Sequence, residues 1–400
     1  MINNNFFSKK NVQEKKIEKE LSKRFNDVYF KIKKDIENTT NTLHILNNKF
    51  KFNFKFKDLR KFKRFKTVAI IGMGGSILGA EAIYNFLEKK VKKKFYFFNN
   101  LDSIKIINFK KKEEVSKTLF IIISKSGNTI ETLSNTFALN ILKKNSKNII
   151  VISEKKKNIL FNLSKKLNLF HIEHKNYIGG RFSVLSEVGV VPAFFMGINI
   201  SKFRSKILNC IKKNRKDILK LNTLKLAAFM KSKKFNNLIF LNYEPKFEKF
   251  LFWCQQLIAE SLGKKNIGFL PMISIAPKDH HSLLQLYLDG PKDKLFNIFS
   301  HEESSKIKIN FNNKIDNNFL NKKNFSKVKR AQKNALIKAF LKKNIPLREF
   351  QLRKINEEAL GELFAYFIIE TVIIAKILNI NPFDQPAVEE VKIYTKQLLK

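Results

Sequence analysis

Short, continuously apolar segments alternate with helical segments over the first half of this 400-residue chain. Apolar runs occupy residues 68–71, 119–123 and 149–152, and helical periodicity occupies residues 77–87 and 130–142 between them. Strands that are apolar at every position belong to parallel sheets buried on both faces, because the intervening helices cover those faces. The pattern predicts an α/β fold built on a doubly wound parallel sheet.

The second half continues this alternation with longer helices. A buried helix is predicted at 184–200, a strand at 238–241 and an amphipathic helix at 246–264, followed by helices at 327–343, 356–378 and 387–399. We therefore predict two doubly wound parallel-sheet lobes, each a three-layer αβα sandwich. The predicted parts are an N-terminal helical arm (1–65), a first lobe (66–200), a second lobe (201–345) and a helical C-terminal segment (346–400).

The chain is strongly basic, with 78 Lys and Arg residues against 34 Asp and Glu and a formal net charge of +44. One interpretation is a polyanionic partner such as nucleic acid. The other is compositional drift, because Lys and Asn are spread along the whole chain and the Phe residues recur at core-like positions. A nucleic-acid module concentrates its charge on one element, so the sequence favours drift and predicts no specific nucleic-acid partner.

Other features of the sequence concern the compartment. The two cysteines, Cys210 and Cys254, allow at most one bridge, which fits a reducing environment. The first residues have no long apolar core behind their charges and do not resemble a secretory signal. The most apolar stretch, 363–378, is interrupted by Glu370 and Lys376 and is too short to span a bilayer. We expect a cytoplasmic protein with no membrane partner.

Glycine is scarce, and its placement is informative. None of the 13 glycines precedes Gly72, and four fall between Gly72 and Gly79, directly after the first predicted strand. Backbone N–H groups and the hydroxyl of Ser76 could face an anion at the start of the following helix. The spacing Gly-x-Gly-Gly-Ser is not a dinucleotide fingerprint, so phosphate binding and tight packing both remain possible.

A second loop follows the next strand and reads Ser124-Lys125-Ser126-Gly127-Asn128-Thr129. Three hydroxyls and a glycine within six residues could surround a phosphate. The alternative is a well-capped helix, with Asn128 or Thr129 as the N-cap. Two such loops on neighbouring strands favour an anion site at the carboxyl edge of the sheet, and one phosphate monoester fits better than a dinucleotide.

Four later segments carry chemical side chains, and each has a plain structural alternative. Arg181, after a Gly-Gly pair, could simply meet a surface carboxylate. Gln256, Glu260 and Lys264 form a polar helical stripe that could be a solvated face with a Glu–Lys pair. Adjacent histidines, His280 and His281, rarely chelate one metal ion well, and no further ligand set with zinc-like spacing accompanies them. Lys392 could belong to a solvated tail.

Together and in this order, the loops and segments resemble the glucose-6-phosphate isomerase family, whose lobes have the sugar-isomerase (SIS) fold. The similarity covers about residues 68–399, with Pro386 and Ala387 departing mildly from the family pattern. It implies a sugar-phosphate site with roles for particular residues. The phosphate- and substrate-binding residues would be Gly75, Ser76, Ser124, Lys125, Ser126, Thr129, Gln256 and Gln385, and the catalytic residues Glu260, Arg181, His281 and Lys392.

The resemblance also implies the reaction. It predicts reversible conversion of glucose 6-phosphate into fructose 6-phosphate, in glycolysis and gluconeogenesis, through ring opening and an enediolate. Glu260 would be the base, Arg181 would stabilise the enediolate, and His281 and Lys392 would open the ring. No cofactor and no metal are expected, and the family pattern implies a homodimer with His281 donated across the interface. A non-catalytic sugar-phosphate sensor and an isomerase acting on mannose phosphate remain alternatives.

Overall fold

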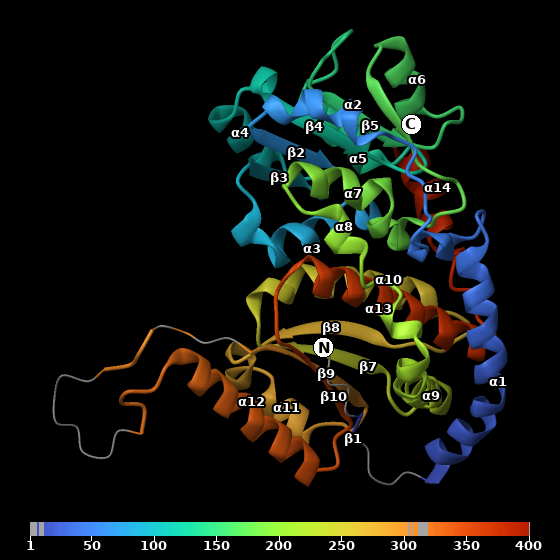
Figure 1. Ribbon diagram of the computed structural model, residues 1–400, viewed down its shortest axis with the longest axis vertical. Coiled ribbons are helices and arrows are strands. Elements are labelled where there is room, and N and C mark those ends of the chain that lie inside the picture. The colour runs from blue at the N-terminus through green and yellow to red at the C-terminus, as the bar shows by residue number, and fades with distance from the viewer. Residues whose placement is uncertain (1–5, 8–11, 303–304, 306, 311–318, 400) are drawn as a thin grey trace.

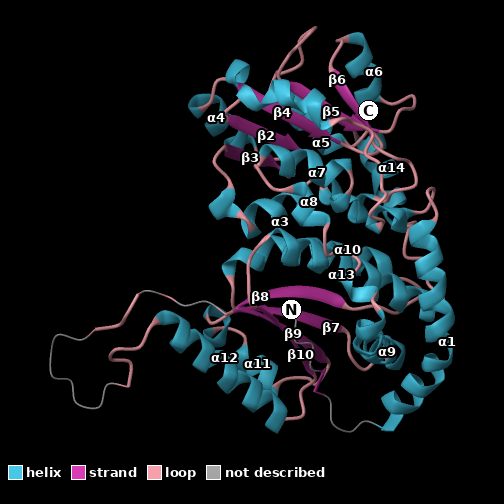
Figure 2. Cartoon of the chain, in the orientation of Figure 1, coloured by secondary structure: helices cyan, strands magenta, loops and turns pink. Residues whose placement is uncertain are grey.

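The computed structural model describes residues 6–7, 12–302, 305, 307–310 and 319–399. These residues form two five-stranded sheets, one in each of two lobes that are stacked along the long axis of the molecule (Figures 1 and 2). Helices cover both faces of each sheet, so both lobes are αβα sandwiches. The predicted fold class is confirmed.

The first sheet is parallel throughout and has the strand order β3-β2-β4-β5-β6. Its strands are β2 (Thr67–Ile71), β3 (Lys94–Phe98), β4 (Thr118–Ile123), β5 (Ile149–Ser153) and β6 (Phe170–Glu173). The three apolar runs predicted as strands are its central strands, in a register that places Val68 opposite Leu119. The two edge strands, β3 and β6, are more polar and were not predicted.

Alternate residues of this sheet face two separate cores. Val68 and Ile70 face the large core shared with the second lobe. Ala69 and Ile71 face the outer core beneath α4 and α5. The helices of this lobe are α2 (Phe56–Leu59), α3 (Leu78–Phe86), α4 (Ser103–Lys112), α5 (Ile130–Ala138), α6 (Ile159–Lys166), α7 (Glu187–Phe195) and α8 (Ile200–Arg204). The predicted helix at 184–200 is broken into a 3₁₀ turn, η6 (Gly180–Leu185), followed by α7 and α8.

The second sheet has the order β1-β10-β9-β7-β8, in which only β1 is antiparallel to its neighbour. Its strands are β7 (Asn237–Asn242), β8 (Leu270–Ile275), β9 (Lys294–His301), β10 (Leu347–Leu352) and β1 (Phe6–Phe7). Strand β10 lies inside the segment predicted to be helical from 346, and β1 inside the predicted helical arm. The predicted boundary at 345 therefore cuts the sheet, and the second lobe extends at least to Leu352.

Helices that include α3, α10 and α13 lie between the two sheets and join the lobes. The large core runs from Ile70 through α3, α10 and α13 to Phe240 and Phe350 of the second sheet. The helix α1 (Val12–Glu37) packs along the side of α9 and α13, as Figure 1 shows. The remaining helices are α9 (Lys216–Ser232), α10 (Glu248–Leu262), α11 (Leu284–Asp289), α12 (Phe325–Lys342), α13 (Glu357–Ile377) and α14 (Val388–Leu398).

Candidate active site

The loop between β4 and α5 brings its hydroxyls together. The Oγ of Ser124 lies 2.9 Å from the Oγ1 of Thr129, which lies 3.5 Å from the Oγ of Ser126. Gly127 donates its N–H to Ser124 Oγ and has φ +66°, and a Cβ there would lie 1.8 Å from Asn158. Thr129 is the N-cap residue of α5, yet its side chain makes no capping bond. Its hydroxyl is therefore directed at the loop rather than at the helix.

The glycine-rich loop between β2 and α3 lies beside this hydroxyl loop, because β2 and β4 are neighbours in the sheet. A Cβ on Gly72 would lie 3.0 Å from the carbonyl oxygen of Ile123, where the hydroxyl loop begins. Gly74 has φ +51°, and a Cβ there would lie 2.7 Å from the Nε2 of Gln256 on α10. Ser76 is half-buried at the end of the loop. The close approaches at Gly72 and Gly74 show tight packing, and the half-buried Ser76 leaves a hydroxyl for an anion, so both alternatives fit this loop.

Lys125 lies in the hydroxyl loop, but its Nζ is engaged elsewhere. It donates to the carbonyl oxygen of Asn176 at 2.7 Å and lies 3.7 Å from the carboxylate of Glu154. Burial lowers the pKa of Lys125, and the negative charge of Glu154 opposes this effect. In this arrangement Lys125 borders the hydroxyl cluster without a described contact to it.

Arg181 is the centre of a second group of site residues. Its guanidinium is buried, with 2% of the side chain exposed, beside the Glu260 carboxylate at 3.0 Å. Nε donates to Ser261 at 2.8 Å, and Nη1 donates to the side-chain oxygen of Gln385 at 2.6 Å. Burial lowers the pKa of Arg181, and the nearby Glu260 offsets part of that shift. The structure thus brings together three segments that are far apart in sequence.

Glu260 faces both Arg181 and solvent. One carboxylate oxygen accepts from Arg181 and the other from the Nε2 of Gln256 at 2.9 Å, one turn earlier on α10. One third of the side chain, 33%, remains exposed. Because Gln256 also touches the glycine-rich loop at Gly74, the carboxylate and that loop share one wall of the site. Glu260 does not pair with Lys264, so the interpretation of a solvated Glu–Lys face is wrong.

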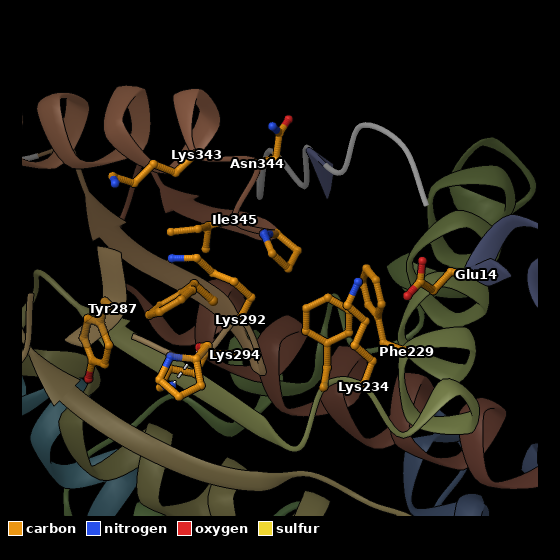
Figure 3. Close-up of a pocket in the computed structure, with 13 residues that line it drawn as sticks. Glu14, Phe229, Lys234, Tyr287, Lys292, Lys294, Lys343, Asn344 and Ile345 are labelled. Atoms are coloured by element: carbon orange, nitrogen blue, oxygen red, sulfur yellow. Dashed lines mark hydrogen bonds between the residues drawn. The ribbon is translucent and has the colours of Figure 1, made fainter. Parts of the chain in front are cut away.

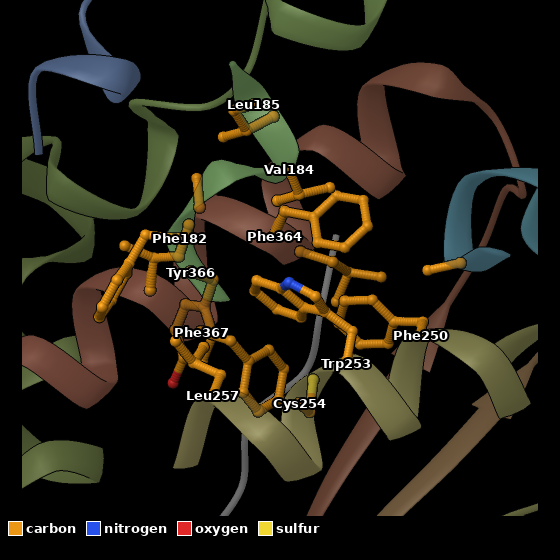
Figure 4. Close-up of a cluster of buried hydrophobic side chains, with 14 of the residues drawn as sticks. Phe182, Val184, Leu185, Phe250, Trp253, Cys254, Leu257, Phe364, Tyr366 and Phe367 are labelled. Atoms are coloured by element: carbon orange, nitrogen blue, oxygen red, sulfur yellow. The ribbon is translucent and has the colours of Figure 1, made fainter. Parts of the chain in front are cut away.

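A buried apolar cluster fixes the elements that carry these residues. Phe182, next to Arg181 in η6, packs in a core shared with α10 and α13 (Figure 4). On α10, Trp253 makes an edge-to-face contact with Phe364 of α13, with ring centroids 4.7 Å apart. Such aromatic packing contributes about 0.5–1.5 kcal/mol per pair beyond the buried area. The guanidinium and the carboxylate therefore stand on a rigid apolar base.

Gly75 explains how closely η6 approaches the glycine-rich loop. A Cβ on Gly75 would lie 2.2 Å from the carbonyl carbon of Gly180. The hydroxyl of Ser183 accordingly reaches the carbonyl oxygen of Gly75 at 3.3 Å. Only a residue without a side chain permits this contact, which places the residue before Arg181 directly against the glycine-rich loop.

His281 is displayed on the surface of the second lobe. It ends the 3₁₀ turn η10 (Lys278–His281), where Asp279 accepts from the backbone of Ile275 at 2.7 Å and so fixes the turn. The ring of His280 lies 2.7 Å from the hydroxyl of Tyr243, whereas the side chain of His281 is exposed. Among the described contacts of this chain, none joins His281 to Arg181 or Glu260.

Lys392 is likewise separate from the other predicted residues. It lies on α14, where every described residue except Thr395 is exposed, and its Nζ contacts Glu389 at 2.6 Å. The described part of the chain gives it no contact with the Arg181 group. Of the predicted catalytic residues, the structure therefore joins Arg181 and Glu260 and leaves His281 and Lys392 outside.

Sequence reasoning missed several contributors to the site. Ser261 is fully buried and accepts a hydrogen bond from Nε of Arg181. The carbonyl oxygens of Pro382 and Asp384 accept hydrogen bonds from Nη2 of Arg181. Ser261 directly follows Glu260, so a search for polar neighbours of the proposed base could have found it. Backbone carbonyls have no signal in a sequence.

One cavity of the described chain lies apart from this site. A cavity of about 240 Å³ lies at the amino ends of β9 and β10, lined by aromatic residues and lysines (Figure 3). None of the predicted site residues lines it. Among the described residues, no group of three His, Cys, Asp or Glu side chains could hold a metal ion. No described helix has both the length and the apolar character needed to cross a bilayer.

The sequence comparisons of this chain with known proteins agree with one another. The sequence model of phosphoglucose isomerase matches residues 32–400. The chain is 34% identical to a glucose-6-phosphate isomerase of Methanocaldococcus jannaschii over 363 residues, covering 86% of each chain. It is 32% identical to the glucose-6-phosphate isomerase of Campylobacter jejuni over 355 residues, covering 84% of this chain and 85% of that one.

Solved structures show the same fold. Hypothetical protein TT0462 of Thermus thermophilus matches with a TM-score of 0.82, at 21% identity and over 100% of both chains. A glucose-6-phosphate isomerase of Chlamydia trachomatis matches with a TM-score of 0.71, at 19% identity, over 85% of this chain and 71% of that one.

Proposed function

Because this chain belongs to the phosphoglucose isomerase family, we propose that Glu260 and Arg181 carry out its interconversion of glucose 6-phosphate and fructose 6-phosphate. The observation that carries this assignment is the Glu260 carboxylate, which is fixed by Arg181 and Gln256 yet remains one-third exposed at 33%. A carboxylate held in place but open to a ligand is suited to moving a proton.

Glu260 is proposed as the base that transfers a proton between C1 and C2 of the open-chain sugar. The reaction removes a proton from one carbon and returns it to the other, so one carboxylate within reach of both carbons suffices. Gln256 fixes one oxygen at 2.9 Å and so limits the orientations that the carboxylate can adopt. General base catalysis of this kind contributes roughly 10²–10⁴-fold to a rate.

Arg181 is proposed to stabilise the enediolate. Negative charge develops on the oxygens at C1 and C2 while the proton is in transit. The buried guanidinium beside Glu260 would stabilise that charge once its Nη1 hydrogens exchange Glu260 and Gln385 for the substrate oxygens. Because burial excludes water, the interaction is stronger than in solution, and one well-placed donor contributes about 3–4 kcal/mol. The apolar base of Figure 4 keeps this donor in place before substrate binds.

The two loops at the carboxyl edge of the first sheet are proposed to hold the phosphate. Ser124, Ser126 and Thr129 supply hydroxyls, and Gly75 and Ser76 line the neighbouring loop, with Lys125 at the border. Helix N-termini add a favourable field for an anion. Binding energy gained at the phosphate positions the far end of the sugar for reaction. The isomerisation itself requires no redox carrier and no metal.

Ring opening is proposed to need a second copy of the chain. His281 is exposed on a fixed turn, while its neighbour His280 is engaged by Tyr243 at 2.7 Å. The exposed helix α14 presents Val391, Ile393 and Tyr394 beside Lys392. A homodimer in the cytoplasm, in which His281 reaches the site of the partner and α14 is covered, would complete the catalytic set. Dilution to monomers with full specific activity retained would contradict this part of the proposal.

The decisive experiment supplies fructose 6-phosphate to the purified protein and follows glucose 6-phosphate with a coupled reporter. We expect turnover by the wild type and a loss of about 10²–10⁴-fold in kcat for Glu260→Gln. The matched control is Glu248→Gln, which changes a partly exposed glutamate at the other end of α10. Binding of the sugar phosphate without turnover would instead support a sensor, and turnover unchanged in Glu260→Gln would remove the base assignment.

A further inference from the structure

The segment between α13 and α14 reaches into the candidate site. We call residues 381–385 the C-terminal turn; it follows Ile377 at the end of α13 and precedes Val388 at the start of α14. Its last residue, Gln385, accepts from Nη1 of Arg181 at 2.6 Å. Within the turn, Asn381 donates to Asp384 at 2.9 Å, and the ring of Phe383 packs against Phe182.

The C-terminal turn accepts three of the five N–H groups of Arg181. Both Nη2 hydrogens go to carbonyl oxygens of the turn, those of Pro382 and Asp384. The Nε hydrogen goes to Ser261, and the two Nη1 hydrogens go to Glu260 and Gln385. While the backbone of the turn stays in place, a substrate can gain a donor only at Nη1, where it would replace the side chain of Glu260 or Gln385 as the acceptor.

Lys264 ties the same turn to the helix that carries Glu260. It lies just beyond the last residue of α10, and its Nζ donates to the carbonyl oxygen of Asn381. It also donates to the carbonyl and side-chain oxygens of Asp384, at 2.7 and 2.6 Å. Only 15% of the Lys264 side chain is exposed, against 52% for Asp384. All three N–H groups of the ammonium thus donate to oxygens of the C-terminal turn.

We infer that Lys264 is a positioning residue, which holds the C-terminal turn against α10 so that Gln385 and the Nη1 edge of Arg181 face Glu260. Lys264 contacts neither Glu260 nor the phosphate loops among the described contacts, so it acts through the turn. This inference rests on the proposed function of Arg181 and Glu260. It predicts that loosening the turn disorders the reacting end of the site and leaves the phosphate end intact.

The test compares Lys264→Met with Lys265→Met in the isomerase assay with fructose 6-phosphate. Methionine keeps an apolar stem and removes the donors. Lys265 is the adjacent lysine, and it donates at 3.0 Å to Asn379, outside the C-terminal turn. For Lys264→Met we expect kcat to fall about 10–100-fold with KM changed less than about threefold, because misplacement of a catalytic group affects the chemical step. For Lys265→Met we expect kcat within about twofold of the wild type.

A second measurement reports directly on the order of the C-terminal turn. Amide hydrogen exchange at residues 383–385 should be at least about tenfold faster in Lys264→Met than in Lys265→Met, with unchanged exchange in the two sheets. Lys264→Met with the kcat of Lys265→Met, or with a raised KM and unchanged kcat, would overturn the inference. Asp384→Ala serves where Lys264→Met does not fold, since half of the Asp384 side chain, 52%, is exposed. It should lower kcat about 3–10-fold, and an unchanged kcat would contradict positioning by the turn.

Failure of the proposed function gives a different result. Absence of turnover in the wild type removes the isomerase assignment, whatever the variants do. The exchange measurement still reports whether Lys264 orders the C-terminal turn. Normal wild-type turnover with equal exchange in both lysine variants removes only the positioning role.

Discussion

Two Arg–Glu pairs in this molecule each have a buried arginine, but their carboxylates have different surroundings. Arg181 and Glu260 lie 3.0 Å apart between the lobes, and Arg348 of β10 pairs with Glu370 of α13 inside the second lobe. The side chains of both arginines are at most 2% exposed, but Glu260 is 33% exposed and Glu370 only 3%. The exposure of the carboxylate separates a pair that can meet a ligand from one that cannot.

The partners of each carboxylate reinforce this contrast. Glu370 accepts from two nitrogens of Arg348 and from the hydroxyl of Tyr366 at 2.7 Å, so protein groups surround it. Glu260 accepts from Arg181 and Gln256 and otherwise faces solvent. Burial lowers the pKa of Arg181. For Arg348, burial acts in the same direction, but the charge of Glu370 outweighs it and the pKa is raised.

The comparison predicts a structural role for Arg348–Glu370, which we call the closed pair, and agrees with the proposed catalytic role of Arg181–Glu260, which we call the open pair. The first prediction tests the closed pair with Arg348→Met, which leaves Glu370 buried without its main partner. Removing one partner of a buried pair costs about 3–5 kcal/mol, so we expect the free energy of unfolding to fall by that amount. Chemical denaturation measures the loss, and kcat per folded molecule should stay within about twofold.

The control for this prediction is the double variant Arg348→Met/Glu370→Gln. It removes the buried charge on both sides while keeping an acceptor for Tyr366, so most of the lost stability should return. A large fall in kcat for the single variant at full folding would break the comparison, because it would give the closed pair a part in the reaction.

The sequence gives a signal for Arg181 but none for Arg348. Arg181 follows Gly179-Gly180 in a recognisable segment, and the apolar strands 68–71 and 119–123 predict the sheet that carries the phosphate loops. Strand β10, Leu-Arg-Glu-Phe-Gln-Leu, was not predicted, because a strand inside a buried sheet rarely carries an arginine. Arg348 is tolerated there because Glu370, 22 residues later, is folded against it and Asn297 accepts from its Nε at 3.1 Å.

A long-range contact also explains why the suggested pair of Glu260 with Lys264 is not formed. Helical spacing places Lys264 four residues after Glu260 and suggests a pair, but α10 ends at Leu262 and Lys264 turns to Asp384. A sequence pattern gives neighbours along one helix, whereas the partner here comes from a turn 120 residues away. The described contacts of this chain do not join His281 or Lys392 to Glu260, and their roles stay predictions.

The second prediction tests the open pair with Arg181→Met, matched to Arg348→Met. We expect kcat/KM for fructose 6-phosphate to fall about 10²–10³-fold, the cost of one oxyanion donor. The loss of stability should be smaller than for Arg348→Met, because the exposed Glu260 can be solvated when its partner is removed. Equal losses of stability in the two methionine variants would show that exposure of the carboxylate is a poor criterion.

The third prediction concerns how the open pair is placed, and uses Gly75→Ala. The added Cβ would lie 2.2 Å from the carbonyl carbon of Gly180 and 2.5 Å from the backbone nitrogen of Arg181, so the backbone must move by about 1 Å. A displacement of that size at a catalytic group costs up to about 10²-fold, and we expect kcat to fall about 10–100-fold. Steady-state kinetics of the folded variant measures the loss.

Gly179→Ala is the matched control for this substitution, in the segment that carries Arg181. Its Cβ would lie 3.2 Å from the ring of Phe182, a side chain that can shift by a few tenths of an ångström, so kcat should fall less than about threefold. If both alanine variants lose activity equally, the glycines are needed for flexibility rather than for close approach. If neither variant loses activity, then Arg181 tolerates displacement. The Arg181–Glu260 and Arg348–Glu370 pairs would then differ in their tolerance of movement as well as in the exposure of the carboxylate.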